Sequence, residues 1–275
     1  MLGLPNKFEE ATRIGTWTRG TWLLRIATAL AVAAAPALAT SATAHSAPGS
    51  PRKIAFIVPG QQLYGSGPTW ESVYTPLRTA LEQRGFETHY IDAPGKLLRN
   101  DAELIRAAVE SQSDEADYVA IVGHSVGGVS GRYYVKELGG TSRVDSIVAI
   151  GSPQYGSPGG CTQGPTEGYE SCVYSDLFPQ LNAGDDTPGN TLYSVVQSSG
   201  EWSDGRLDGG QCRSYVDGVV GSGTGVDHLA EIFDPRITAQ VADAADGNCP
   251  GSFVDEADGS ITWRDTISPN APQIA

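Results

Sequence analysis

The stretch Tyr118–Gly128, with the sequence YVAIVGHSVGG, determines the fold of the surrounding chain. It begins with the apolar run Val119–Val122, whose β-branched residues are typical of a buried strand. Glycines then interrupt the run, and the next stretch, Val129–Leu138 (VSGRYYVKEL), can form a helix. The pattern predicts a strand, a tight turn and a helix, with Ser125 in the turn.

The turn Gly123–Gly127 (GHSVG) fits the G-x-S-x-G nucleophile elbow. A tight turn from strand to helix would hold Ser125 in a strained conformation, and glycines on both sides would leave room for the neighbouring chain. The start of the following helix would point backbone N–H groups at the place where negative charge develops. The alternative is a glycine-rich turn with an ordinary serine. The flanking strand and helix favour the elbow, so Ser125 is the candidate nucleophile.

Apolar patterns on both sides of this stretch alternate between strand and helix. Strands are expected at Lys53–Val58, Phe86–Ile91 and Val144–Ile150. Helices are expected at Leu97–Ser111 and at Trp70–Arg84, where Pro76 limits the helix to its later part. This alternation predicts an α/β fold with a mainly parallel central sheet and helices on both faces. Ligands of such sheets bind at the carboxyl ends of the strands, which is where Ser125 stands.

The second half of the chain is less regular. Gln154–Asn190 is rich in glycine and proline and predicts a long irregular excursion, with a short helix near Tyr174–Leu181. Further on we expect strands at Thr191–Gln197 and Cys212–Val216, a helix over Val226–Ala245 and an edge strand at Ser260–Trp263.

The length of 275 residues is enough for one α/β domain with a sizeable core. The formal net charge is −14, although the first 44 residues carry four basic and two acidic residues. The remainder is therefore even more acidic than the whole chain. Such a charge argues against nucleic acid or an anionic membrane as a partner.

Residues 1–44 have the features of an export signal. Basic residues precede the apolar run Ile26–Ala39, and small-residue cleavage patterns follow at Ala37–Ala39 and Ala42–Ala44. The rival interpretation is a transmembrane anchor. The run is short, alanine-rich and broken by Pro36, which favours cleavage. We therefore expect a secreted protein in which residues 45–275 form a single catalytic domain.

Four cysteines, an even number, follow this segment and predict two disulfides in an exported chain. The short spacing favours Cys161–Cys172 as one pair, which leaves Cys212 with Cys249. A zinc site is the alternative. No C-x-x-C motif is present, and His228 is the only histidine near a cysteine in the sequence, so a metal site is disfavoured.

A serine nucleophile needs a base within hydrogen-bond reach and an acid to orient that base. The chain has four histidines: His45, His89, His124 and His228. Elbow enzymes place the residues in the order serine, acid, histidine. His124 flanks the serine, where neighbouring side chains point apart, and only His228 lies downstream. His228 is therefore the candidate base, with a solvated loop histidine as the alternative.

The acid is expected in a loop after a strand, between Ser125 and His228. The strand Thr191–Gln197 is followed by SSGEWSD, in which Glu201 is the best placed carboxylate. Asp204 is the second candidate, and Asp208 and Asp217 also satisfy the order. Most of these carboxylates must be solvated loop charges.

An oxyanion hole needs two backbone donors. One is the N–H of Val126, directly after the nucleophile. The other is expected in the loop after the first strand, where Pro59, Gly60 and Gln61 stand. We assign it to the Gln61 N–H, with Gln62 in reserve; the alternative for this loop is a plain turn.

The chain resembles the small secreted bacterial lipases of the class 2 group in the α/β-hydrolase superfamily. The residues that carry the resemblance, within about Lys53 to Ala245, are GHSVGG with RYYVKELGG, VDSIVAIGSP, QSSGEW and GVDHL. The resemblance implies a compact α/β-hydrolase fold and gives the family's roles to Gln61, Ser125, Glu201 and His228. Two departures are visible: Pro59 replaces the family's usual histidine, and Glu201 stands where aspartate is commoner.

These observations predict a carboxylic ester hydrolase that needs no cofactor, takes an ester or lipid substrate and acts as a monomer. Acidic turns at Asp185–Asp186 and around Asp204 and Asp208 could hold calcium, but a solvated turn is the favoured interpretation. Two alternatives stay open: an acyltransferase or peptidase on the same fold, and a non-catalytic binding protein. The complete set of serine, acid and histidine argues against the second.

Overall fold

A computed structural model describes residues 50–62, 68–269 and 271. The predicted signal segment, residues 1–44, lies outside them. The described chain is built on a seven-stranded sheet in the order β2-β1-β3-β4-β5-β6-β7, parallel except for the last pair. Within that described part, no helix is long and apolar enough to span a membrane.

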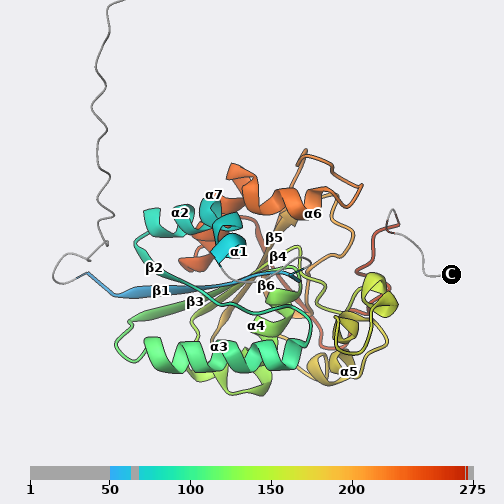
Figure 1. Cartoon of the computed structure of the whole chain (residues 1–275), viewed down its shortest axis with the longest axis horizontal. Coiled ribbons are helices and arrows are strands. Elements are labelled where there is room, and N and C mark those ends of the chain that lie inside the picture. The colour runs from blue at the N-terminus through green and yellow to red at the C-terminus, as the bar shows by residue number, and fades with distance from the viewer. Residues whose placement is uncertain (1–49, 63–67, 270, 272–275) are drawn as a thin grey trace, which may run out of the picture. The chain divides into compact units, whose positions relative to one another are not determined.

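The predicted strands form the centre of this sheet, and the elbow strand β3 lies between β1 and β4 (Figure 1). The strand bounds are β1 (Lys53–Val58), β2 (Phe86–Tyr90), β3 (Tyr118–His124), β4 (Ser146–Ile150), β5 (Leu192–Ser198), β6 (Gly209–Val216) and β7 (Ser252–Glu256). The four residues Ile147–Ile150 and the run Val119–Val122 are buried, as their apolar character predicts.

Helices cover both faces of the sheet, which agrees with the predicted fold class (Figure 1). The helix bounds are α1 (Pro68–Val73), α2 (Thr75–Gln83), α3 (Leu98–Gln112), α4 (Val126–Glu137), α5 (Leu177–Leu181), α6 (Asp227–Ala230) and α7 (Pro235–Ala245). Helices α2 and α7 pack on one face, and α3 and α4 pack on the other. Each face has its own apolar core, one around Phe56 and Ile121, the other around Ile57 and Val122.

The expected effect of Pro76 on the stretch Trp70–Arg84 is confirmed, and two other predicted helix boundaries were wrong for identifiable reasons. The stretch Trp70–Arg84 contains two helices that meet at Tyr74, because Pro76 fits the first turn of α2 and not a helix interior. The stretch Val226–Ala245 also breaks, into α6, a 3-10 turn and α7, since Pro235 starts a new helix behind the cap Asp234. Helix α4 begins directly after Ser125 and not at Val129.

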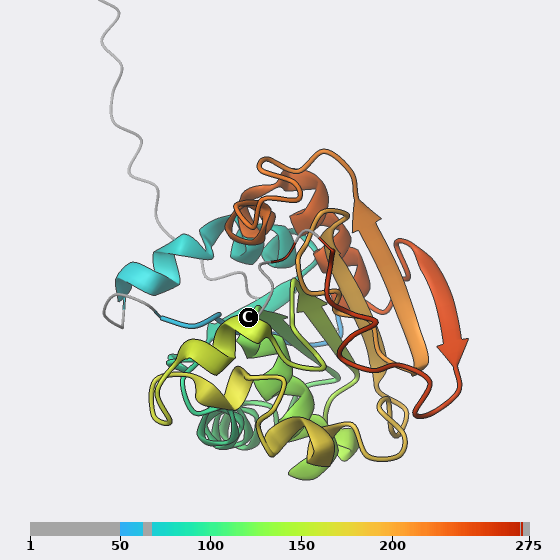
Figure 2. The same cartoon turned by 90° about the vertical axis from the view of Figure 1, so that its right-hand side faces the viewer.

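The edge of the sheet also differs from the expectation. The predicted strand Ser260–Trp263 is not a strand, and the edge is formed instead by β7, which runs antiparallel to β6 (Figure 2). None of residues 252–256 is buried, and Phe253 is largely exposed. The sequence of this strand therefore has no apolar pattern that would indicate burial. A turn at Asp258 and Gly259 follows Glu256 and prevents the strand from continuing.

Both disulfides join the predicted pairs. Cys161–Cys172 closes a loop within the excursion 154–190, which holds two 3-10 turns and α5. Cys212–Cys249 joins β6 to the segment between α7 and β7. The second bridge therefore ties the end of the last helix to the sheet.

Candidate active site

Ser125 lies at the sharp turn between β3 and α4, with φ 55° and ψ −133°. Among the described residues it is the only non-glycine residue with a positive φ. Its N–H donates to the carbonyl oxygen of Ile150 at 2.8 Å, which fixes the turn against β4. A strained serine at the carboxyl end of a central strand is the geometry that the G-x-S-x-G pattern predicts.

The two glycines of the motif, Gly123 and Gly127, lie where the neighbouring backbone leaves no room for a Cβ atom. A Cβ on Gly123 would overlap the backbone of Gly128 in the first turn of α4. A Cβ on Gly127 would overlap the carbonyl oxygens of Val58 and Pro59, where β1 ends. The glycines thus let α4 approach both strands closely enough for Ser125 to face the loop after β1.

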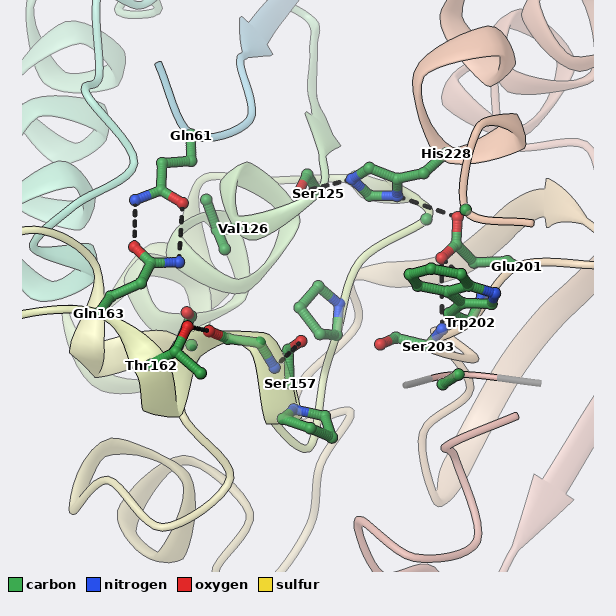
Figure 3. Close-up of a pocket in the computed structure, with 18 residues that line it drawn as sticks. Gln61, Ser125, Val126, Ser157, Thr162, Gln163, Glu201, Trp202, Ser203 and His228 are labelled. Carbon is green, nitrogen blue, oxygen red and sulfur yellow. Dashed lines mark hydrogen bonds and ion pairs between the residues drawn. The ribbon is translucent and has the colours of Figure 1, made fainter. Parts of the chain in front are cut away.

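The structure brings Ser125, His228 and Glu201 into one hydrogen-bonded chain (Figure 3). Nε2 of His228 lies 3.0 Å from Oγ of Ser125, and Nδ1 lies 2.9 Å from Oε2 of Glu201. The three residues come from the turn after β3, the start of α6 and the loop after β5. With Nδ1–H donated to the carboxylate, Nε2 is free to accept the serine proton.

Glu201 is the carboxylate at this position, and the other candidates lie elsewhere. Its Oε1 accepts hydrogen bonds from the N–H groups of Trp202 at 2.7 Å and Ser203 at 3.3 Å, which leaves Oε2 for His228. Asp204 instead accepts from Tyr215 Oη at 2.9 Å and pairs with Arg206. Asp208 is buried at the start of β6, and Asp217 is exposed beyond its end.

The electrostatic environment suits His228 for accepting a proton. Burial lowers its pKa, but the hydrogen bond and the charge of Glu201 raise it more, followed by the charge of Asp227. The net effect is a pKa above the ordinary value of 6.5. The Glu201 side chain is only 4% exposed, so solvent screens this pairing little.

The loop after β1, residues 59–62, lies where the second backbone donor is expected, and we call it the oxyanion loop. Gly60 passes so close to Ser125 that a Cβ on Gly60 would lie 2.8 Å from the Cβ of Ser125. The N–H of Gln62 already donates to the carbonyl of Pro94 at 3.0 Å, which removes the reserve candidate. Gln61 and Val126 both line the cavity at Ser125 (Figure 3). Their N–H groups are the candidate oxyanion donors.

The side chain of Gln61 joins this loop to the excursion. Its Nε2 donates to Oε1 of Gln163 at 2.6 Å and to the carbonyl of Glu167, and its Oε1 accepts from Nε2 of Gln163 at 3.2 Å (Figure 3). Lys96 pairs with the Glu167 carboxylate at 2.6 Å beside it. The excursion is thereby held against the oxyanion loop.

The excursion forms one wall of a cavity of about 670 Å³ that opens at Ser125. Ser157, Pro158 and Thr162 line this wall, and Trp202 and Ala271 line the opposite one. Among the described residues, the lining combines small and polar residues with Val126, Trp202 and two prolines. The cavity beside Ser125 is therefore partly polar.

Tyr74 was not among the site residues predicted from the sequence, and His124 was predicted to point away from the site. The structure buries both and links them: Tyr74 Oη lies 3.1 Å from Nδ1 of His124, and Nε2 of His124 lies 3.0 Å from the carbonyl oxygen of His228. Tyr74 Oη also accepts the N–H of Gly60 at 2.9 Å. Its hydroxyl proton must therefore go to Nδ1, and Nε2–H of His124 donates to His228.

Burial, then the neighbouring imidazole of His228, lowers the pKa of His124 to about 3. Burial also raises the pKa of Tyr74 to about 12. Both groups are therefore neutral over the ordinary pH range, so the hydrogen-bond chain Gly60–Tyr74–His124–His228 does not depend on pH there. It connects the oxyanion loop with the backbone of the candidate base.

Within the described residues, one group of three side chains could offer atoms to a single ion: His124, His228 and Glu231. Both ring nitrogens of His124 and both of His228 are already in the hydrogen bonds above. We assign no metal there.

The acidic turns are only partly solvated: Asp185 is exposed, as expected, whereas Asp186 and Asp208 are buried. Asp186 is fully buried, pairs with the buried Arg132 at 3.1 Å and accepts from Tyr155 Oη at 2.7 Å. Asp208 is 2% exposed and accepts the N–H of Gly259 at 2.7 Å. The buried Arg132 therefore balances the charge of Asp186. Calcium had been the alternative interpretation of this turn.

Several solved structures resemble this fold. Lipase B of Aspergillus fumigatus is 16% identical with a TM-score of 0.53 over 82% of this chain, which spans 59% of the length of that protein. The mature lipase BlEst2 of Bacillus licheniformis is 16% identical with a TM-score of 0.46 over 83% of each chain. A cutinase-like protein from a Cryptococcus species is 14% identical with a TM-score of 0.41 over 74% of this chain and 99% of the other.

No protein-family model and no curated protein matches the sequence. The fold itself, a mostly parallel seven-stranded sheet with helices on both faces, is the α/β-hydrolase fold. A serine–histidine–glutamate chain at the carboxyl ends of its central strands completes the description of the site.

Proposed function

We propose that this protein is an exported carboxylic ester hydrolase, a lipase or esterase of the small class 2 lipase type. The observation that carries the proposal is the continuous hydrogen-bonded chain Ser125–His228–Glu201 at the mouth of a cavity. A binding protein has no chemical need of this chain. The two disulfides support an oxidising, extracellular location.

In the proposed reaction Oγ of Ser125 attacks the acyl carbon while Nε2 of His228 takes its proton. The carbonyl oxygen becomes an oxyanion and accepts from the N–H groups of Gln61 and Val126. His228 then gives the proton to the leaving alkoxide, so the alcohol departs and an acyl-serine remains. Water attacks the acyl group by the same route and restores Ser125. Glu201 keeps the imidazole in the correct tautomer throughout.

The test combines covalent labelling with hydrolysis. The purified protein should react with a fluorophosphonate probe at Ser125 and hydrolyse p-nitrophenyl esters. Ser125→Ala and His228→Ala should each remain folded and lose activity by a factor on the order of 10⁴ or more.

A chain-length series would identify the preferred acyl group, and added alcohols or amide substrates would reveal acyl transfer or peptidase activity. A folded wild-type protein that neither labels nor hydrolyses any ester would contradict the proposal. So would a Ser125→Ala variant with a near-native rate.

A further inference from the structure

A second carboxyl group, that of Glu231, lies beside the site without a role in the proposed reaction. Glu231 follows His228 by three residues in the 3-10 turn after α6, and it is fully buried. Its Oε1 accepts the N–H of Ser198 at 2.6 Å, at the end of β5. Its Oε2 is buried and has no hydrogen-bond partner in the described part of the chain. An unpartnered buried carboxyl oxygen is costly and calls for an explanation.

This free oxygen faces the Glu201–His228 pair. A Cβ on Gly151 would overlap Oε2 of Glu231 and lie 3.1 Å from both Oε2 of Glu201 and Nδ1 of His228. Gly151, which has a positive φ of 51°, thus leaves a shared space for these three atoms. A carboxylate oxygen of Glu231 also lies within 4.8 Å of a ring nitrogen of His228. Oε2 of Glu231 therefore lies beside the hydrogen bond between Glu201 and His228.

Two carboxyl groups in one buried space do not both ionise easily. Burial raises the pKa of Glu231 well above its ordinary value, and the charge of Glu201 raises it further. The N–H of Ser198 opposes this effect and the charge of Asp227 adds to it. The titratable groups that face Glu231 are Glu201, Asp227, His228 and His124. Glu231 is therefore the neutral member of the pair while Glu201 carries the charge.

We propose that Glu201 and Glu231 together hold a single negative charge for His228, and that Glu231 is a positioning residue able to replace Glu201. While Glu201 is charged, Glu231 keeps its proton. When Glu201 is removed, Glu231 releases that proton to solvent, and its carboxylate accepts Nδ1–H of His228 instead. This inference rests on the proposed function of His228 as the base.

The proposal predicts an unusual order among substitutions of Glu201. In Glu201→Gln the amide still fills the site, and its NH₂ group donates to Nδ1, which forces the wrong tautomer of His228. That variant should lose a factor of about 10³–10⁴ in kcat. Glu201→Ala empties the space, so Glu231 can take over, and the loss should be only about 10–100-fold. Equal or greater loss in Glu201→Ala would overturn the proposal.

A second comparison tests whether Glu231 is responsible for the activity that remains in Glu201→Ala. Adding Glu231→Gln to Glu201→Ala should cost at least about a further 100-fold in kcat, whereas Glu231→Gln alone should change kcat only a few-fold. The glutamine keeps an acceptor for the N–H of Ser198, so the end of β5 stays anchored. The matched control is Asp208→Asn, another buried carboxyl whose pKa burial and the charge of Asp186 raise to about 6. Adding it to Glu201→Ala should leave the rate unchanged.

A measurement without substrate separates this inference from the proposed function. NMR titration of the His228 ring in a Ser125→Ala background should give a pKa above 6.5 in the intact pair. The pKa of His228 should stay raised in Glu201→Ala and fall when Glu231→Gln is added, because only the charge of Asp227 then opposes the effect of burial. A fall already in Glu201→Ala would sink the inference even if the protein hydrolyses esters. The comparison of kcat between Glu201→Ala and Glu201→Gln leaves Glu231 unchanged. The proposal can therefore be tested even if Glu231→Gln does not fold.

Discussion

Glu201 and Asp204 are carboxylates three residues apart in one loop, yet they have different hydrogen-bond partners. Glu201 is 8% exposed, and its two oxygens are divided between backbone N–H groups and His228. Asp204 faces Tyr215 and Arg206 on the other side of the loop, where it stabilises local structure. Chain order alone admits both residues, and the difference arises from which backbone groups the loop turns inward.

We therefore expect Glu201→Gln to lower kcat for p-nitrophenyl ester hydrolysis by about 10³-fold or more, because the histidine tautomer is lost. Asp204→Asn is the matched control and should change kcat by no more than about threefold. Steady-state kinetics on both folded variants checks the ranking. The reverse order would transfer the acid role to Asp204.

At the scale of elements, the site depends on contacts between segments that are distant in sequence. The buried chain from Gly60 through Tyr74 and His124 connects the end of β1, the junction of α1 with α2, the end of β3 and the start of α6. The two hydrogen bonds of Tyr74 Oη are buried, where a missing partner costs about 1–3 kcal/mol, and the bond from His124 to His228 is partly buried. The oxyanion loop and His228 are thus fixed by one internal network.

Tyr74→Phe should break this network at its centre. The N–H of Gly60 loses its acceptor and Nδ1 of His124 loses its donor, so we expect a stability loss of about 2–4 kcal/mol. Activity should fall by about tenfold as the oxyanion loop loosens. Tyr193→Phe is a suitable control, since Tyr193 Oη donates at 3.1 Å to Pro188 near the opposite end of β5. It should lower the melting temperature slightly and leave kcat/KM unchanged.

A Tyr74→Phe variant as active as Tyr193→Phe would show that the network only stabilises the fold. Thermal unfolding and kcat/KM measured on the same preparations separate the two outcomes.

The elements that the sequence predicted well are those whose signal is local. The β-branched runs of β1, β3 and β4 are buried on both faces, and the glycines beside Ser125 mark a close contact that any such turn requires. The edge strand β7 was missed because an exposed edge leaves no clear apolar pattern. The burial of His124 and of Glu231 could not be predicted, because their partners come from other parts of the chain.

At the scale of the whole molecule, the disulfides hold the two sides of the site in different ways. Cys212–Cys249 joins a strand inside the sheet to the segment after α7, and His228 lies between these two cysteines in sequence. Cys161–Cys172 instead closes a loop of the excursion that lines the cavity. One bridge therefore supports the fold around His228, and the other shapes the wall that a substrate meets.

Replacing Cys212 and Cys249 together by serine should lower the free energy of unfolding by roughly 3–4 kcal/mol in the chain-entropy model, and activity should fall with it. The double serine variant of Cys161 and Cys172 is the comparison. It should shift the chain-length preference for p-nitrophenyl esters more than it lowers the melting temperature.

Denaturant unfolding and an ester series on both variants give the comparison, and non-reducing peptide mapping verifies the pairing. Equal melting temperatures with unchanged substrate preference would contradict both assignments.

The backbone angles of Ser125 have an evolutionary consequence. A positive φ costs a serine on the order of 1–3 kcal/mol, and glycine adopts the same angle without that steric cost. Selection for stability alone would therefore favour glycine at this position in every generation. A lineage that no longer needed a nucleophile would be expected to lose Ser125 first, while the surrounding strands and helices persisted. The proposed nucleophilic role of Ser125 would account for a serine and not a glycine at this turn.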